Sequence, residues 1–246
     1  MNEKGIVERP GQLLSRLEFY RDLGVEFLVS PMKTDSRKRE AEVGTGLLKP
    51  EGFSGGPAAD DREEWDRLIR RIMACQACPL FKGRTQAVPG EGHRQASLMF
   101  VGEAPGRDED LQGRPFVGRA GQLLTKIIQA MGFSREEVYI ANVIKCRPPE
   151  NRTPRPDEIK ACSPYLLRQI DLIKPRVIVA LGKVATDFLL PSSKSMSELR
   201  GQFGDFQGIP VMPTFHPSYL VRNEGNKEIK KMVWEDMKKV LQLLKS

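Results

Sequence analysis

The chain has 246 residues, of which 39% are hydrophobic and 29% are charged, and its formal net charge is +7 at pH 7. This length can bury a sizeable core, and no stretch approaches the roughly 18 consecutive apolar residues of a membrane span, so we expect no membrane-spanning helix. The basic charge favours an anionic partner such as nucleic acid. The first residues contain no apolar signal segment, so we expect a cytoplasmic protein whose four Cys are thiols.

Residues 1–60 are expected to form an N-terminal extension. Helical spacing over 12–28 predicts a short helix, and residues 31–60, rich in Lys, Arg, Glu, Gly and Pro, are typical of a flexible linker. The extension is either a frayed end without function or a helix that docks on a partner. The compact domain is expected over 61–246.

The domain alternates helices with apolar strands. We expect strands over 97–101, 138–144, 176–182 and 209–215, and helices over 61–73, 119–131, 156–173, 184–190 and 227–244. This alternation predicts an α/β fold with a central, mostly parallel four-stranded sheet and helices on both faces.

Polar side chains stand at or near the ends of three of these strands. Glu103 lies in the turn Gly102-Glu-Ala-Pro-Gly106, Asn142 lies near the end of the second strand, and His216 follows the last. Parallel strands end at a common edge, where α/β proteins bind ligands, so we expect these residues to form a site. Taken singly, each has an ordinary alternative: a solvated turn carboxylate, a satisfied amide, or a capping imidazole.

The chemistry of these residue types suits hydrolysis, and hydrolysis of an N-glycosidic bond is one reaction that it fits. A carboxylate such as Glu103 can orient water or balance a developing cation. The Asn142 amide can accept from N3–H of uracil and donate to its O4, whereas cytosine presents the opposite polarity at both positions. A donor such as His216 can stabilise a departing base anion. Phe116, in a Gly/Arg/Pro loop, is either a core plug or a stacking platform for a base.

The four cysteines form a second candidate site. Cys75 and Cys78 are a Cys-x-x-Cys pair, and Cys146 and Cys162 follow with 15 residues between them. The set fits four-thiolate ligation of zinc or of an iron–sulfur cluster, while a redox dithiol or buried unliganded thiols are the alternatives. The spacing does not choose among them.

Taken together, these motifs resemble the family 4 uracil-DNA glycosylases, the iron–sulfur type of bacteria and archaea. The resemblance covers about residue 65 to the C-terminus. It is carried by Gly102-Glu-Ala-Pro-Gly106, Gly113-Arg-Pro-Phe-Val-Gly118, Asn142-Val-Ile-Lys-Cys-Arg-Pro-Pro149, His216-Pro-Ser-Tyr-Leu220 and the four cysteines.

The resemblance implies a DNA-repair enzyme that flips uracil out of DNA and hydrolyses its N-glycosidic bond, leaving an abasic site. It implies that Glu103 positions the attacking water or stabilises the sugar cation, and that His216 faces the uracil O2 as it departs. The backbone of Ala104 would contact uracil, Phe116 would stack on it, and Asn142 would read its polar edge.

Further roles follow from the same resemblance. Tyr219, Leu220 and Arg222 would lie on a loop that enters the duplex, and Glu109 would exclude the thymine methyl. Cys75, Cys78, Cys146 and Cys162 would hold a structural [4Fe–4S] cluster. The expected partner of this monomer is uracil-containing DNA, single- or double-stranded.

Two alternatives to this function stay open from the sequence. The first is a glycosylase of the same fold that accepts a wider range of damaged bases. The second is a non-catalytic iron–sulfur DNA-binding module associated with replication, although simple binding would not need Glu103 and His216.

Overall fold

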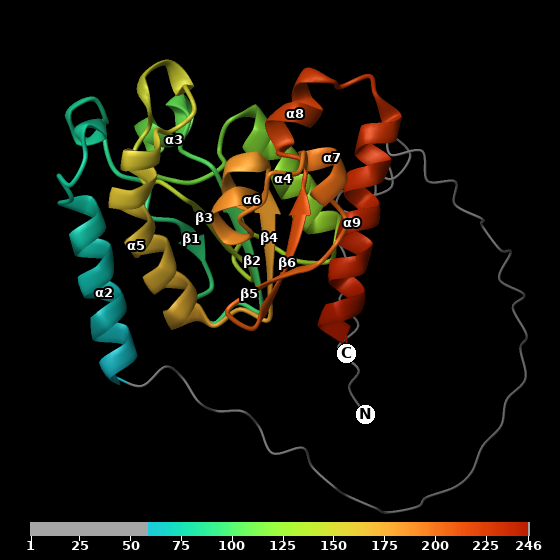
Figure 1. Cartoon of the computed structure of the whole chain (residues 1–246). Coiled ribbons are helices and arrows are strands. Elements are labelled where there is room, and N and C mark those ends of the chain that lie inside the picture. Colours follow the sequence, from blue (N-terminus) through green and yellow to red (C-terminus); the bar gives the residue numbers. More distant parts are fainter. Residues whose placement is uncertain (1–58, 246) are drawn as a thin grey trace, which may run out of the picture.

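A computed structural model describes residues 59–245 of the chain. The expected helix over 12–28 and nearly all of the linker over 31–60 lie outside the described residues. Helix α2 begins at Ala59, two residues before the predicted start. Elements carry the labels of Figure 1, where the chain is coloured from its N-terminus to its C-terminus.

The centre of the protein is a six-stranded sheet with the order β1-β3-β2-β4-β6-β5. Its inner four strands run parallel, and the two edge strands are antiparallel to their neighbours. The strands are β1 (Glu91–Gly92), β2 (Leu98–Gly102), β3 (Tyr139–Asn142), β4 (Val177–Leu181), β5 (Gly204–Phe206) and β6 (Ile209–Thr214).

The predicted parallel core is therefore confirmed, but the predicted count of four strands is wrong. The two additional strands are only two and three residues long. Neither contains an apolar run or a full period of alternation, so their strand geometry comes from pairing with β3 and β6.

Helices cover both faces of the sheet, as the alternation predicted (Figure 1). One face packs against α2, α5 and α6, and the opposite face packs against α4, α8 and α9. The helices are α2 (Ala59–Met73), α3 (Arg107–Gln112), α4 (Arg119–Ala130), α5 (Pro156–Ile173), α6 (Lys183–Leu189), α7 (Met196–Leu199), α8 (Pro217–Arg222) and α9 (Lys227–Lys245), with 3-10 turns at Pro79–Lys82 and Pro149–Asn151.

The hydrophobic pattern accounts for this layering. Every residue of β2 and β4 is buried because helices cover both sides of these central strands. On α4, Leu124, Ile127 and Ile128 follow the helical spacing that faces one side, and all three are buried. The predicted helices are confirmed to within two residues, whereas the short helices α3, α7 and α8 were not predicted.

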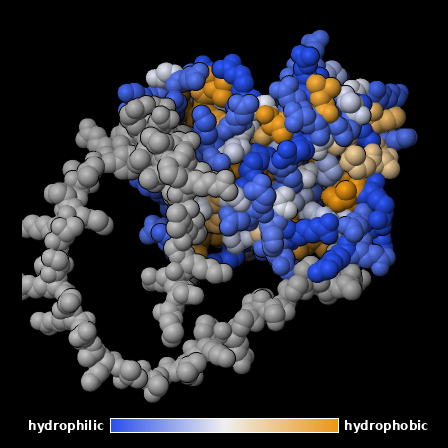
Figure 2. Space-filling view, turned by 180° about the vertical axis from the view of Figure 1, so that it is seen from behind, coloured by the Kyte–Doolittle hydropathy of each residue, from blue (hydrophilic) through white to orange (hydrophobic). Residues whose placement is uncertain are grey.

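The visible surface of the described residues is mainly hydrophilic. In Figure 2, seen from behind the view of Figure 1, hydrophobic residues appear as separate small patches among polar ones. Within residues 59–245, none of the helices combines the length and the apolar character needed to cross a membrane.

Candidate active site

The ends of β2, β3, β4 and β6 surround a cleft of about 870 Å³. Glu103, Asn142 and His216 all line it, which is the convergence that the strand-end argument predicted. Strands β2 and β4 are neighbours, but the chain passes from β2 to β3 on one side of the sheet order and from β4 toward β6 on the other. The connections that follow these two strands therefore diverge and open a crevice between them. The other cleft residues used below are Ala104, Arg107, Glu109, Phe116, Arg119, Arg152, Lys183, Phe215, Ser218, Tyr219 and Arg222.

Glu103 and Asn142 come together because β2 and β3 are paired in register. Gly102 lies opposite Asn142 in the parallel ladder. The pairing continues past the strand ends, where Ile144 N–H donates to the Glu103 carbonyl at 3.2 Å. The Glu103 side chain is half-buried, and this burial raises the pKa of its carboxyl above the ordinary value. The cleft thus holds a carboxyl group that is more basic than one in water.

Asn142 presents an unsatisfied acceptor to the cleft. Its side chain is 2% exposed, and its Oδ1 makes no hydrogen bond within the described part of the chain. A buried acceptor without a partner costs free energy, so such atoms in native proteins commonly serve a ligand or an ordered water. We interpret Asn142 Oδ1 as the acceptor for a donor on a bound molecule.

Phe116 lies in the loop between α3 and α4, with its ring directed into the site. Its ring centroid is 5.6 Å from that of His216. Its backbone has a φ of 52°, a left-handed conformation that is uncommon for an aromatic residue. Gly102 makes room for the ring, since a Cβ there would lie 2.5 Å from Phe116 Cζ and 2.5 Å from Asn142 Oδ1.

Glu109 reaches across the cleft rim with both carboxylate oxygens occupied. Oε1 accepts from the N–H groups of Val117 at 2.8 Å and Gly118 at 2.9 Å. Oε2 accepts from Gly106 N–H at 3.1 Å. Glu109 therefore ties the turn that carries Glu103 and the half-buried Ala104 to the loop that carries Phe116.

His216 caps the N-terminus of α8 and is held as a neutral imidazole. Its Nδ1 accepts from Ser218 N–H at 3.1 Å, and Ser218 Oγ lies 2.8 Å from the same nitrogen. Burial, reinforced by the charge of Arg222, lowers the pKa of His216 to about 4. Because Nδ1 is an acceptor, the proton of the neutral ring lies on Nε2, which remains available as a donor. Ser218 has no role in the sequence-based prediction.

Residues 217–222 form helix α8 and not the predicted loop. The His216 side chain accepts a hydrogen bond from Ser218 N–H, and Pro217 occupies the first position of the helix. Both features stabilise a helix that starts here. Tyr219 is exposed and packs on Phe215 at a centroid distance of 5.1 Å. Leu220 is only 3% exposed and packs in the core, so the structure does not bring it into the cleft.

Several cationic residues of the cleft were missed by sequence reasoning. Arg107, Arg119 and Lys183 line it together with Arg222. Lys183 directly follows the end of β4 and Gly182, so the same strand-end argument could have identified it. Arg107 and Arg119 begin α3 and α4, and no local signal shows that these helices face the cleft.

The four cysteines line one small cavity between the end of α2, the turn after β3 and helix α5. Cys146 Sγ accepts from Arg84 at 3.0 Å, and Cys162 Sγ accepts from Lys145 N–H at 3.2 Å. Burial raises the pKa of Cys78 and Cys146 and raises that of Cys162 to about 12. Across the described residues, no three His, Cys, Asp or Glu side chains are grouped as ligands of a single ion.

These thiols fit a metal centre. Thiolates are the ligating form of Cys, and burial disfavours that form here unless a cation compensates it. Four buried or half-buried thiols that share one cavity are a donor set suited to a zinc ion or to an iron–sulfur cluster.

Comparisons with known proteins agree with this geometry. The family model described as the uracil DNA glycosylase superfamily matches residues 89–238. The chain is 50% identical over 187 residues to a type-4 uracil-DNA glycosylase of Thermotoga maritima, covering 75% of this chain and 97% of that protein. It is 46% identical over 190 residues to the type-4 enzyme of Saccharolobus solfataricus (74% and 87% covered) and 45% identical over 187 residues to that of Sulfurisphaera tokodaii (72% and 84%).

Proposed function

The chain belongs to the type-4 uracil-DNA glycosylases of the uracil DNA glycosylase superfamily, and we propose that it binds and excises uracil in the cleft at the ends of β2, β3, β4 and β6. Its reaction is hydrolysis of the N-glycosidic bond of uracil in DNA, a step of DNA repair. The cleft volume of about 870 Å³ accommodates a flipped base with its sugar and flanking phosphates.

The observation that carries this proposal is the unpartnered Oδ1 of Asn142. Uracil carries a donor at N3, which would satisfy this acceptor on binding. Cytosine carries an acceptor at N3, so its binding would place two acceptors together and leave both unsatisfied. A site that leaves a buried polar group unpaired discriminates strongly between such bases. Asn142 is therefore the residue that selects uracil.

Glu103 and His216 carry the chemistry. Water adds to the C1′ carbon of the sugar while the electrons of the N-glycosidic bond leave with uracil as an anion. The Glu103 carboxylate orients that water and accepts its proton, a role that its raised pKa favours. The Nε2–H of neutral His216 donates to the departing O2 and stabilises the negative charge that develops there.

The walls of the cleft hold the base in place. Phe116 stacks on the uracil ring, and the backbone of Ala104 contacts its edge. Glu109 excludes thymine by fixing the position of the turn and the loop that face the C5 methyl group. A rigid wall rejects a methyl group better than a mobile one because the methyl group would have to displace bonded backbone.

The cationic rim of the cleft binds the DNA backbone. Arg107, Arg119, Lys183 and Arg222 supply positive charge for phosphates. Tyr219, exposed on α8 as Arg222 is, would enter the space that the flipped nucleotide leaves. A role for the buried Leu220 in the duplex would require α8 to shift.

Uracil is removed faster from single strands and from U·G pairs than from U·A pairs, because flipping costs least for an unpaired or mispaired base. Excision rates on three otherwise identical oligonucleotides measure this order. Equal rates on all three would show that flipping does not limit the reaction.

Cys75, Cys78, Cys146 and Cys162 hold a [4Fe–4S] cluster, which supplies a structural link between α2, the turn after β3 and α5. The support is the shared cavity and the donor set of four buried or half-buried thiols. Lys145 lines the same cavity, and its amine donates to the Asn142 carbonyl at 2.9 Å. A cluster bound there would therefore stabilise the strand end that carries Asn142.

The test of the proposed site is substitution of Asn142. Asn142→Ala removes the acceptor, so we expect uracil excision to fall by about 100-fold, as for loss of a hydrogen bond made in the transition state. Inhibition by free uracil should weaken in parallel. A variant that folds, excises uracil at the wild-type rate and binds uracil equally well would remove Asn142 from the site.

A further inference from the structure

The loop that carries Phe116 is held in a strained conformation by contacts on two sides. Phe116 has a φ of 52°, which an aromatic side chain adopts only when its surroundings impose it. On one side, Glu109 accepts from the N–H groups of Val117 and Gly118. On the other, Arg135 Nη2 donates to the Pro115 carbonyl at 2.7 Å and Nη1 donates to the Phe116 carbonyl at 3.1 Å.

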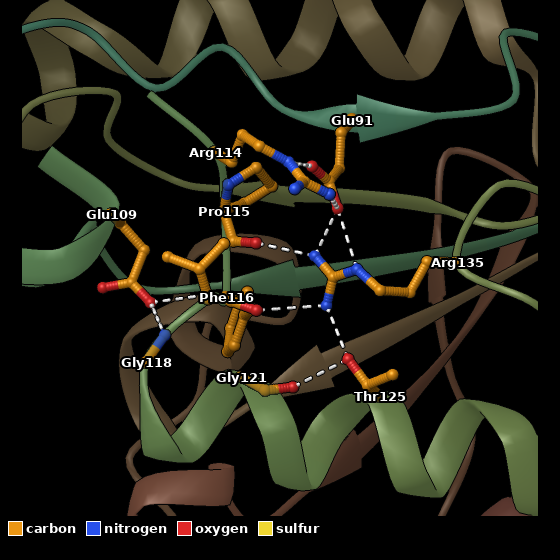
Figure 3. Close-up of polar contacts among 10 residues, drawn as sticks. Glu91, Glu109, Arg114, Pro115, Phe116, Gly118, Gly121, Thr125 and Arg135 are labelled. Carbon is orange, nitrogen blue, oxygen red and sulfur yellow. Dashed lines mark hydrogen bonds and ion pairs between the residues drawn. The ribbon is translucent and has the colours of Figure 1, made fainter. Parts of the chain in front are cut away.

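Arg135 is itself fixed by two further partners. Glu91 Oε1 accepts from Arg135 Nε at 2.8 Å and from its Nη2. Thr125 Oγ1 accepts from Arg135 Nη1 at 2.9 Å and donates to the Gly121 carbonyl at 3.0 Å. Figure 3 shows the guanidinium between Glu91 on β1 and the Phe116 loop, with Thr125 and Gly121 on α4. The Arg135 side chain is 12% exposed, so water competes weakly for these bonds.

The space around Phe116 leaves the loop little freedom. A Cβ at Gly121 would lie 1.9 Å from the Phe116 carbonyl carbon, so helix α4 approaches the loop backbone as closely as glycine permits. The ring itself packs on Gly102 and faces His216. A small displacement of the Phe116 backbone would therefore carry the ring away from the proposed uracil position.

We propose that Arg135, oriented by Glu91, is a positioning residue for base recognition: it fixes the backbone of Phe116 so that the ring stacks on uracil. Arg135 and Glu91 do not line the cleft, so they act only through the loop. The inference rests on the proposed stacking role of Phe116. It also gives a function to the short edge strand β1, which presents Glu91 beside Arg135.

The test compares Arg135→Gln with a matched control, Arg67→Gln. Arg67 also pairs with a carboxylate, Glu63 at 3.0 Å, but it lies on α2, its side chain is 63% exposed, and it donates to no carbonyl of the Phe116 loop among the contacts described. Single-turnover excision of uracil should fall by about 100-fold in Arg135→Gln, the loss expected from a displacement of about 1 Å in a reacting site. Arg67→Gln should stay within about twofold of wild type. Equal rates for the two variants would overturn the proposal.

A double-mutant cycle separates positioning from general destabilisation. If Arg135 acts through Phe116, Arg135→Gln adds no further loss to Phe116→Ala, in excision or in inhibition by free uracil. If the two losses multiply, Arg135 acts elsewhere and the proposal is wrong. Wild-type activity of Phe116→Ala alone would instead overturn the stacking role on which the inference rests.

Two milder variants keep the test decisive if Arg135→Gln does not fold. Arg135→Lys keeps the charge beside Glu91 but cannot donate to both carbonyls in a fixed fork, so it should restore folding without restoring the rate. Glu91→Gln removes the carboxylate that orients the Arg135 guanidinium, so it should also lower the excision rate. Full activity of both variants, measured well below their melting temperatures, would contradict the proposal.

Discussion

Ser218 N–H donates to Nδ1 of His216 at 3.1 Å, and this contact places the imidazole proton on Nε2. The pKa of His216, lowered to about 4 by burial and by Arg222, keeps the ring neutral throughout the physiological range. Neutral His216 can donate to a departing base without first being charged. The pH dependence of the reaction therefore has to come from another group.

That group is Glu103, whose pKa is raised by burial. We expect the single-turnover rate to be flat at neutral pH and to fall as pH drops through the raised pKa of Glu103, because the protonated carboxyl cannot accept a proton from water. No inflection is expected near the ordinary His pKa of about 6.5. His216→Gln should lower the plateau by about 100- to 1,000-fold and leave the acid limb in place.

Rates measured between about pH 4 and pH 9 for wild type and His216→Gln check this assignment. An acid limb that moves or disappears in His216→Gln would mean that His216 is the titrating group.

Glu103 should also lower the stability of the folded protein at neutral pH. The pKa of the Glu103 carboxyl is higher in the folded protein than in the unfolded chain, because burial favours the neutral form. The stability that this neutral carboxyl allows is fully present below the unfolded pKa. It is lost as pH rises through the folded pKa and the buried group becomes charged. Glu103→Gln should therefore raise the melting temperature at about pH 7 to 8, with the gain vanishing towards about pH 4.

Glu158 supplies the matched control with the opposite sign. Its pKa is lowered by the hydrogen bonds from Arg152, so it contributes stability above its unfolded pKa that is lost as pH falls through the folded pKa. Glu158→Gln should lower the melting temperature at neutral pH and have less effect in acid. If Glu103→Gln lowered the melting temperature at neutral pH, as Glu158→Gln should, the assigned burial of charge at Glu103 would be incorrect.

Gly102 is predicted to be essential for reasons of space. A methyl group there would lie 2.5 Å from both Asn142 Oδ1 and Phe116 Cζ, so Gly102→Ala must displace the Asn142 amide and the Phe116 ring together. Excision should fall by about 100-fold, with a loss of about 1–3 kcal/mol in the free energy of unfolding.

Gly83→Ala is the matched control, because a Cβ there meets nothing within 4 Å and the backbone φ is −108°. It should leave excision unchanged. Wild-type excision by Gly102→Ala would show that the ring and the amide are not positioned as described.

Some parts of the structure could be predicted from the sequence and others could not, for physical reasons. Glu103, Asn142 and His216 could be placed together because three apolar strands and the geometry of parallel sheets determine where strands end. The edge strands β1 and β5 could not be predicted from the sequence, since they form only by pairing with β3 and β6.

The contacts around the Phe116 loop also could not be predicted from the sequence. Arg135 binds the carbonyl of a residue 19 positions away and a carboxylate 44 positions away, and no local pattern indicates such distant partners. Residues 217–222 read as a loop because the capping contact from Ser218 to His216 is a feature of conformation and not of spacing.

The four cysteines give a prediction about metal content. Cys146→Ser should lose iron and its brown colour and should lower the melting temperature, because the proposed cluster would link the turn after β3 to α2 and α5. Iron, sulfide and zinc analysis of the purified wild-type chain distinguishes a cluster from a zinc site. A Cys146→Ser protein that stayed brown, folded and fully active would refute the structural role.

Cleavage of an end-labelled single-stranded oligonucleotide with one central uracil, followed by hot alkali, tests the central claim most directly. Wild type should break the strand at uracil and leave a thymine oligonucleotide intact, and Glu103→Ala should be slower by at least about 100-fold. Glu63→Ala, an exposed carboxylate on α2, should match wild type. Undiminished cleavage by a folded Glu103→Ala protein would contradict the account, because the cleft carboxylate would then have no part in the chemistry.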